Sequence, residues 1–144
     1  MNILVFCQYY YPEQFRINDI CEQLILEGHS VTVLTGLPNY PKGKILNEYK
    51  WRKNRKETIN GVNVIRVFEL ARGNGVIRLA LNYLSYMFSA TFKTLFLKKD
   101  FDLIFVYQLS PVTMAFPAVI AKKINCWTRR AIQPVFVSGR EKIR

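Results

Sequence analysis

The stretch "ILVFCQYYYPEQFRINDICEQLILEGHSVTVLTG", residues 3–36, decides the fold. It begins with a short, continuous apolar run, which is typical of a strand buried on both faces. Apolar residues then recur at helical spacing from Ile17 to Ile25, and Gly28 follows as a C-terminal helix cap. Residues 30–36 have the pattern of a second strand. A strand, a helix and a strand within about 35 residues form a βαβ unit, which predicts a parallel sheet.

The rest of the chain continues this α/β pattern. "TINGVNVIRVFE" places Asn60-Gly61 between alternating β-branched residues, which predicts a hairpin with a type I′ turn. We therefore predict an α/β fold, a Rossmann-like parallel sheet with flanking helices, in one domain over residues 1–124. The further expected elements are a helix at 76–99, a buried strand at 103–107, an apolar helix from 110 to about 124 and a last strand at 134–138.

The expected helix at 76–99 has two unlike faces. Arg78 and Lys93 interrupt it, whereas a transmembrane helix would need about 20 uninterrupted apolar residues. An amphipathic helix, half in the core and half at a membrane surface, fits this pattern better. Its large apolar side chains share one face and its polar ones another: Leu81, Leu84, Phe88, Phe92 and Leu95, against Asn82, Ser85, Ser89 and Lys93.

The chain is strongly basic, with a formal charge of +11. Residues 71–144 hold most of the excess, with twelve Lys and Arg against three Asp and Glu. "KWRKNRK", residues 50–56, is a further basic segment, compatible with a solvated charge run, an anionic membrane surface or nucleic acid. No nucleic-acid recognition motif accompanies it, so we expect a membrane surface and no nucleic acid. The predicted membrane contacts are Trp51, Lys53, Arg55 and Lys56.

Three loops are expected at the carboxyl edge of the parallel sheet, where open α/β folds bind ligands. They are the tyrosine-rich loop after residue 8, "GLPNYPKGK" at 36–44 and "YQLSP" at 107–111. Their aromatic and polar side chains suit a ring-shaped polar ligand, although Pro/Gly surface turns have a similar composition. The chain has no dinucleotide fingerprint and no P-loop, and its one histidine, His29, has no second metal ligand beside it. We expect no cofactor and no metal.

Several segments together resemble the N-terminal half of family 4-type bacterial glycosyltransferases, which have the GT-B fold. Within that group the sequence is most similar to the N-acetyl-L-fucosamine transferases of lipopolysaccharide O-antigen, capsule and colanic-acid biosynthesis. The resemblance covers residues 1 to about 124. Its segments are "QYYYPEQFRINDICEQL", "GHSVTVLTGLPNYPKGKI", "INGVNVIRV", "LNYLSYMFSA" and "FDLIFVYQLSPVTMAFPA".

The resemblance implies two Rossmann-like domains with the active site in the cleft between them. The N-terminal domain would receive the acceptor, a lipid-diphosphate-linked glycan at the cytoplasmic face of the cell membrane. The C-terminal domain of a complete enzyme would bind the sugar nucleotide donor. No catalytic residue is assigned to this chain. Transferred residue by residue, the resemblance places these side chains at the acceptor: Tyr11, Pro12, Glu13, Arg16, Asn18, Asn39, Tyr40 and Gln108.

The sequence departs from the family pattern after Lys123. Residues 125–144 are expected to form a divergent, flexible tail, and the donor-binding half does not follow. We therefore expect a truncated C-terminal part and no sugar transfer by the chain alone. The predicted function is the acceptor-binding half of a glycosyltransferase, peripheral at the inner face of the membrane. The alternative is a non-catalytic domain that docks on membranes or on a partner protein, and a basic nucleic-acid binder ranks lowest.

Overall fold

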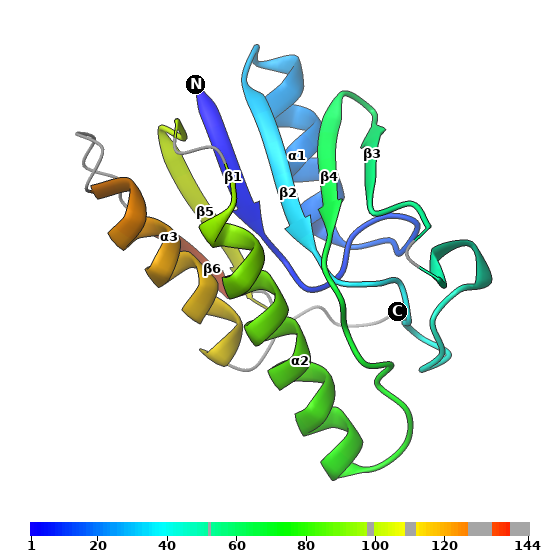
Figure 1. Cartoon of the computed structure of the whole chain (residues 1–144). Helices are drawn as coiled ribbons and strands as arrows, with labels where there is room; N and C mark the ends of the chain where they lie inside the picture. The colour runs from blue at the N-terminus through cyan, green and yellow to red at the C-terminus, as the bar shows by residue number, and fades with distance from the viewer. Residues whose placement is uncertain (52, 98–99, 109–111, 127–133, 139–144) are drawn as a thin grey trace.

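One six-stranded sheet forms the centre of the fold, with helices on both of its faces (Figure 1). The computed structural model describes residues 1–51, 53–97, 100–108, 112–126 and 134–138. The strands are β1 (Asn2–Phe6), β2 (Ser30–Thr35), β3 (Lys56–Ile59), β4 (Val62–Arg66), β5 (Leu103–Gln108) and β6 (Pro134–Ser138). The helices are α1 (Arg16–Leu26), α2 (Val76–Leu95) and α3 (Phe116–Cys126), with short 3-10 turns η1 (Asn47–Tyr49) and η2 (Val112–Ala115).

The sheet is parallel except at one edge. Its strand order is β3-β4-β2-β1-β5-β6, and among the described strands only β3 runs antiparallel to its neighbour. α1 covers one face, while α2 and α3 cover the other (Figure 1). This arrangement confirms the predicted α/β fold, a Rossmann-like and mostly parallel sheet with flanking helices.

The C-terminal part of the chain is described only in pieces. The last predicted strand, at 134–138, is present as β6 and pairs in parallel with β5. The predicted domain boundary at residue 124 falls within the last turn of α3. Most of the tail expected at 125–144 lies outside the described residues, so its flexibility stays a prediction.

The predicted βαβ unit is formed by β1, α1 and β2, whose strands pair in parallel along the length of β1. α1 ends in a Schellman motif: the N–H of Gly28 donates to the carbonyl of Ile25 at 2.9 Å, and that of His29 to Leu24 at 3.0 Å. Gly28 has a φ of +82°, which glycine adopts without strain. The helix therefore ends at the glycine that the sequence indicated.

The hairpin between β3 and β4 turns at Asn60-Gly61, as predicted. The two residues have positive φ values of 49° and 82°, as a two-residue type I′ turn requires. Asn60 Nδ2 also donates to Glu22 Oε1 at 2.8 Å, which ties the turn to α1. A Cβ on residue 61 would lie 3.1 Å from Ile25 Cγ2.

Gly61→Ala is expected to lower the free energy of unfolding by about 1 to 2 kcal/mol, because alanine is strained at positive φ and its Cβ would press on Ile25. Gly28→Ala is the matched control: it has the same positive φ of 82°, but its Cβ would meet nothing within 4 Å, so it should cost only about 1 kcal/mol. Urea denaturation measures both variants. Equal stability of Gly61→Ala and the unaltered chain would show that the turn has a different conformation in solution.

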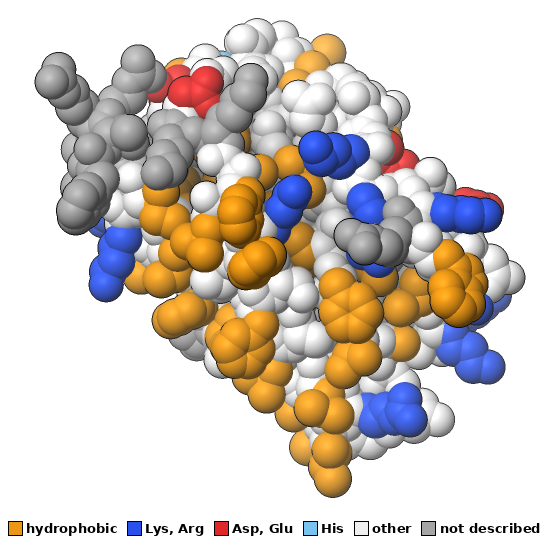
Figure 2. All heavy atoms as spheres, in the orientation of Figure 1, with side chains coloured by type: hydrophobic (Ala, Val, Ile, Leu, Met, Phe, Trp, Pro, Cys, Tyr) orange, Lys and Arg blue, Asp and Glu red, His pale blue; other side chains and the backbone are white. Residues whose placement is uncertain are grey.

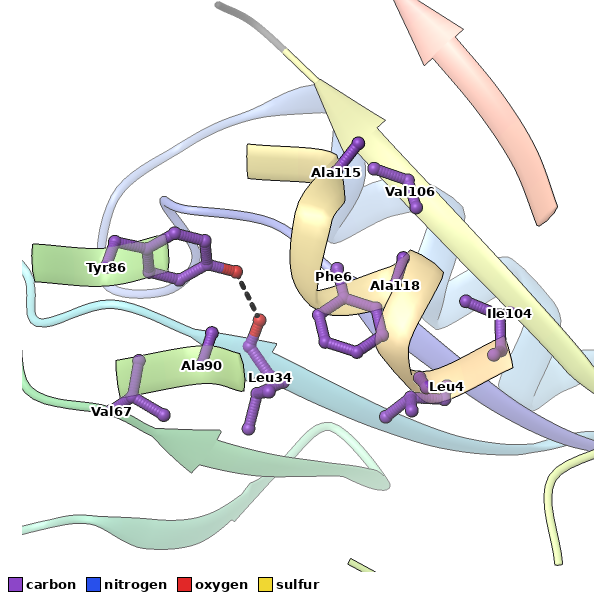
Figure 3. Packing of buried hydrophobic residues seen from close by; sticks show 11 residues of the cluster. Leu4, Phe6, Leu34, Val67, Tyr86, Ala90, Ile104, Val106, Ala115 and Ala118 are labelled. Carbon is purple, nitrogen blue, oxygen red and sulfur yellow. Dashed lines mark hydrogen bonds between the residues drawn. The ribbon is translucent and has the colours of Figure 1, made fainter. Parts of the chain in front are cut away.

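Alternate residues of the strands fill two hydrophobic layers. Leu4 and Phe6 of β1 belong to the layer under α2 and α3, whereas Ile3 and Val5 belong to the layer under α1. Figure 3 shows the first layer, with Phe6 lying beside Ala118 of α3. Full burial of such side chains contributes about 1.5 to 3 kcal/mol each, so these layers hold the helices on the sheet.

α2 packs on the sheet through small and polar side chains, and its large apolar side chains are exposed. The Tyr86 hydroxyl lies 3.1 Å from the Leu34 carbonyl oxygen and donates a hydrogen bond to it (Figure 3). The buried row is Asn82, Tyr86, Ala90 and Thr94. The exposed row is Leu81, Leu84, Phe88, Phe92 and Leu95. Even so, no helix in the described residues is long and apolar enough to cross a membrane.

Candidate binding site at the carboxyl edge of the sheet

The loops after β1 and β2 meet at the carboxyl edge of the sheet, as predicted. The Gln8 carbonyl oxygen accepts hydrogen bonds from the Gly36 N–H and from the Thr35 hydroxyl, each at 3.0 Å. Gln8 follows β1, and Gly36 follows β2. The two loops are therefore joined through the backbone where they leave the sheet, and they form one surface.

Glu13 links the same two loops farther from the sheet. Its Oε1 accepts hydrogen bonds from the N–H groups of Asn39, at 2.8 Å, and Tyr40, at 2.5 Å. Its own carbonyl accepts a bond from Asn18 Nδ2 at 2.8 Å. Burial raises the pKa of Glu13 to about 7, although the two N–H groups act in the opposite direction. The buried side chain of Glu13 therefore joins the two loops by hydrogen bonds.

An aromatic cluster lies next to this link between the two loops. The rings of Tyr9 and Phe15 stack with centroids 5.5 Å apart. Tyr40, from the loop after β2, lies 5.9 Å from Tyr9 and 5.5 Å from Phe15. Tyr40 is half-buried, so one part of the cluster reaches the surface. Such contacts stabilise by about 0.5 to 1.5 kcal/mol per pair beyond the area that they bury.

A buried polar network lies below the aromatic cluster and joins four segments of the chain. Glu69, which follows β4, accepts hydrogen bonds on Oε1 from Asn39 Nδ2 at 2.5 Å and from Asn82 Nδ2 at 2.7 Å. Gln8 Nε2 donates to Asn82 Oδ1 at 2.7 Å. All four residues are at most 2% exposed. The network thus fixes α2 and three loop segments relative to one another.

Glu69 is a carboxylic acid that burial keeps largely protonated. Burial raises its pKa to about 8, although hydrogen bonds from Asn82 and Asn39 lower it. Within the described residues, Glu69 Oε2 and Gln8 Oε1 have no hydrogen-bond partner. A proton on Oε2 would give this network a donor that the ionised form lacks. The uncharged form therefore suits the site better than the carboxylate does.

Gly36 leaves the space that this carboxyl group fills. A Cβ at position 36 would lie 1.8 Å from Glu69 Oε2 and 3.0 Å from the Gln8 carbonyl oxygen. Both distances are shorter than a van der Waals contact, and the first is impossible without displacing Glu69. Glycine is required here for close approach, since its φ is not in the left-handed region.

Arg66 places a buried cation beneath the loop after β1. Its Nε donates to Glu57 Oε1 at 2.7 Å, and its Nη2 donates to the Tyr11 carbonyl at 2.5 Å. The guanidinium carbon also lies 4.6 Å from the centre of the Tyr49 ring. The positive charge of Arg66 is therefore paired within the protein, and the side chain stabilises the loop after β1.

Sequence reasoning missed Glu69, Arg66, Asn82 and Gln8 as parts of this site. Arg66 and Glu69 could have been identified from their position, because they are charged residues in the run "VIRVFE" at the carboxyl end of a strand. For Gln8 and Asn82 the sequence carried no comparable signal. The polar, basic composition of residues 37–57 predicts a connection outside the core, but the structure buries some of its residues, among them Leu37 and Tyr49.

The structure brings most of the predicted acceptor residues together at this edge. Glu13, Asn18 and Asn39 are buried: Glu13 and Asn39 join the two loops, and Asn18 of α1 donates to the Glu13 carbonyl. Gln108 ends β5 at the same edge of the sheet, and residues 109–111 of that loop lie outside the described part. The residues that remain at least partly accessible are Tyr11, Pro12, Arg16 and Tyr40.

The predicted membrane contacts lie on an accessible part of the surface. Trp51 is 91% exposed, Lys53 and Lys56 are exposed, and Arg55 is half-buried. Figure 2 shows hydrophobic side chains gathered over α2, with Lys and Arg side chains beside them. A surface hollow of about 490 Å³ lies between α2 and the β3–β4 hairpin, and Arg55 and Lys56 are among its lining residues.

Comparison with known proteins adds no family assignment. Neither a protein-family model nor a curated protein matches this chain. The fold, the joined loops and the exposed face of α2 are therefore the findings on which a functional proposal rests.

Proposed function

We propose that the chain is the acceptor-side domain of a membrane-associated glycosyltransferase and binds a lipid-diphosphate-linked glycan at the inner face of the cell membrane. One observation carries this proposal. A polar and aromatic loop surface and an exposed apolar helix face bordered by Lys and Arg occur on the same small domain. A glycan attached to a lipid presents the same two kinds of surface. The sugar nucleotide donor would bind elsewhere in the complete enzyme.

The loop surface has the chemistry that the glycan end would need. Tyr40 offers a half-buried ring and a hydroxyl group, and Pro12 is exposed in the loop after β1. Arg16 begins α1 and is exposed, and its guanidinium group can donate several hydrogen bonds to oxygen atoms of the glycan. Glu13 supports this surface from below, because it holds the Tyr40 backbone in place. The rigid support would keep the loops in a binding geometry before the acceptor arrives.

The helix face has the chemistry that the lipid end would need. Phe88 and Phe92 are 66% and 65% exposed, although aromatic side chains of this size are usually buried. Lys53 and Lys56 lie in the basic segment before and at the start of β3. Each Lys or Arg close to an anionic membrane contributes about 1 kcal/mol to binding. An apolar face beside basic residues is the pattern of a helix that lies in a membrane interface.

Vesicle flotation with three lipid compositions tests the proposal. We compare neutral vesicles, anionic vesicles, and anionic vesicles that contain a polyprenyl-diphosphate-linked N-acetylamino sugar. The two anionic preparations have the same surface charge. We expect binding to rise about tenfold or more from neutral to anionic vesicles and to rise again with the glycolipid. Tyr40→Ala should remove the second rise and leave the first unchanged.

A matched pair of variants identifies the membrane-facing side. Phe88→Ser, on the exposed face of α2, should weaken binding to every vesicle by about tenfold, because it removes one inserted aromatic side chain. Leu26→Ser is the control, since Leu26 is 80% exposed on α1, over the other face of the sheet. Equal effects of the two substitutions would contradict the proposed orientation.

A non-catalytic docking domain is the second candidate function, and the exposed apolar row of α2 favours it independently of the loops. Such a domain would bind anionic vesicles with no preference for the glycolipid. The same flotation experiment therefore separates the two candidates. Binding to none of the vesicles would reject both of them as membrane proteins.

A further inference from the structure

The helical layer of the fold stops short of one edge of the sheet. α2 and α3 cover the central strands, but on the same side of β3 and β4 the side chains of Lys56, Thr58 and Asn63 are exposed. Ile65 of β4 lies on this side too and is half-buried. The hollow of about 490 Å³ lies here, between α2 and the β3–β4 hairpin. We call this hollow the lateral groove.

The lateral groove combines an apolar wall with a cationic rim. Its apolar side chains include Phe68, 53% exposed, and Phe92, 65% exposed. Its cations include Lys56 from β3 and Lys93 from the last turn of α2. None of the described residues that line it is an Asp or a Glu. An anion would therefore meet positive groups from two different elements without a competing carboxylate.

A second hollow extends the groove toward the carboxyl edge of the sheet. Its volume is about 440 Å³, and it shares Arg55 and Phe68 with the lateral groove. It is also lined by Leu37, in the loop after β2, and by the exposed Trp51. The two hollows together connect the apolar face of α2 with Leu37, in the loop after β2.

We infer that the lateral groove binds the phosphate ester of a long hydrocarbon chain, one molecule per protein chain. The phosphate lies at Lys56 and Lys93, and the first part of the hydrocarbon lies over Phe68 and Phe92. A compact, negatively charged phosphate group suits two ammonium groups that come from separate elements. The volume of the groove lies within the range of small-molecule sites, which is roughly 300 to 1,000 Å³.

A single-stranded nucleic acid is the rival ligand, since it also combines phosphates with surfaces that stack on aromatic rings. The structure favours the lipid for one reason. The groove is continuous with the exposed apolar row of α2, where Phe88 and Leu84 lie, and this row suits a hydrocarbon environment better than a polyanion. The nucleic acid becomes one outcome of the test.

The biological role of this site rests on the proposed function, because the bound lipid phosphate would be that of the acceptor. Its existence is tested without sugar and without a membrane. A soluble lipid phosphate binds or fails to bind the groove whether or not Tyr40 recognises a glycan. Failure of glycolipid recognition on vesicles and failure of the groove are therefore separate results.

Isothermal titration calorimetry on the full chain, with farnesyl monophosphate as the probe, tests the inference. We expect one site per chain, with farnesol and inorganic phosphate each binding at least about tenfold more weakly. Lys93→Ala should weaken binding of the probe by about tenfold, the loss of one charge-assisted hydrogen bond. Lys123→Ala is the matched control, since it removes a lysine from the last turn of α3, outside the groove, and should have no effect.

Phe92→Ala provides a second variant. It should also weaken the binding of farnesyl monophosphate about tenfold, but it should leave the salt dependence of binding unchanged. Both substituted side chains of the groove are accessible, so thermal melting should show folded variants. Equal effects of Lys93→Ala and Lys123→Ala would overturn the inference. So would binding of inorganic phosphate as tight as that of the lipid, or displacement of the probe by a single-stranded oligonucleotide at equal phosphate concentration.

Discussion

Gly36→Ala is expected to lower the free energy of unfolding by about 4 kcal/mol, a large fraction of the roughly 5 to 15 kcal/mol that stabilises a typical domain. The added Cβ would lie 1.8 Å from Glu69 Oε2, so the carboxyl group has to move. Overpacking in a core costs about 1 to 3 kcal/mol, and breaking the bonds from Asn39 and Asn82 leaves buried polar groups unpaired at a similar cost. Guanidinium denaturation followed by circular dichroism measures the change.

A double-mutant cycle tests the stated cause. Glu69→Ala removes the group that the new Cβ would strike, so Gly36→Ala should cost only about 1 kcal/mol on that background, from the remaining contact with the Gln8 carbonyl. Gly75→Ala is a control, because a Cβ there would meet nothing within 4 Å and its cost is that of positive φ alone. Additive effects of the two substitutions at positions 36 and 69 would mean that the carboxyl group lies elsewhere in solution.

The second large effect is on pH dependence: the chain is expected to be several kcal/mol more stable at pH 5 than at pH 8. Burial raises the pKa of Glu69 to about 8, against 4.5 in the unfolded chain. Between these values the folded state binds a proton that the unfolded state has released, so stability falls as pH rises. Each pH unit in this window costs about 1.4 kcal/mol per group. Glu13, with a pKa of about 7, adds a smaller fall in stability between pH 4.5 and 7.

Glu69→Gln should remove the larger part of this fall, because an amide has no proton to lose. The variant is expected to be about 1 to 3 kcal/mol more stable than the unaltered chain at pH 8 and no more stable at pH 5. Glu48→Gln, at an exposed position, is the matched control and should follow the unaltered chain. Denaturation at several pH values and constant ionic strength measures the curves. Parallel curves for Glu69→Gln and the unaltered chain would show that Glu69 is ionised when folded.

These two results would also bear on the proposed acceptor site. Glu69 and Glu13 hold the loops after β1 and β2, and Glu69 also holds α2 through Asn82. The loop surface and the helix face proposed for glycan and lipid are therefore fixed to each other by one buried network. If Glu69 ionises, the network loses a donor, and the relative position of the two surfaces is expected to loosen.

The sequence by itself determined the order and the direction of the main elements. The apolar run at 3–8, the helical spacing and Gly28 were sufficient for the βαβ unit, because each depends on residues close together in the chain. Asn60-Gly61 was sufficient for the hairpin, because a type I′ turn needs positive φ at both positions. Parallel pairing then placed the loops after β1 and β2, which contain Glu13 and Asn39, at one edge of the sheet.

Only the tertiary structure decided what those side chains do. The sequence identified the two faces of α2, but Ala90 and the hydrogen-bonded Tyr86 pack on the sheet, and the larger apolar row is exposed. Hydrophobicity alone did not select the face, because close approach to the sheet requires small side chains and partners for buried polar groups. Glu69 is buried for a related reason: its amide partners lie 30 and 13 positions away in the chain. Contacts of that kind have no local pattern, and they exist only when the sheet and α2 have come together.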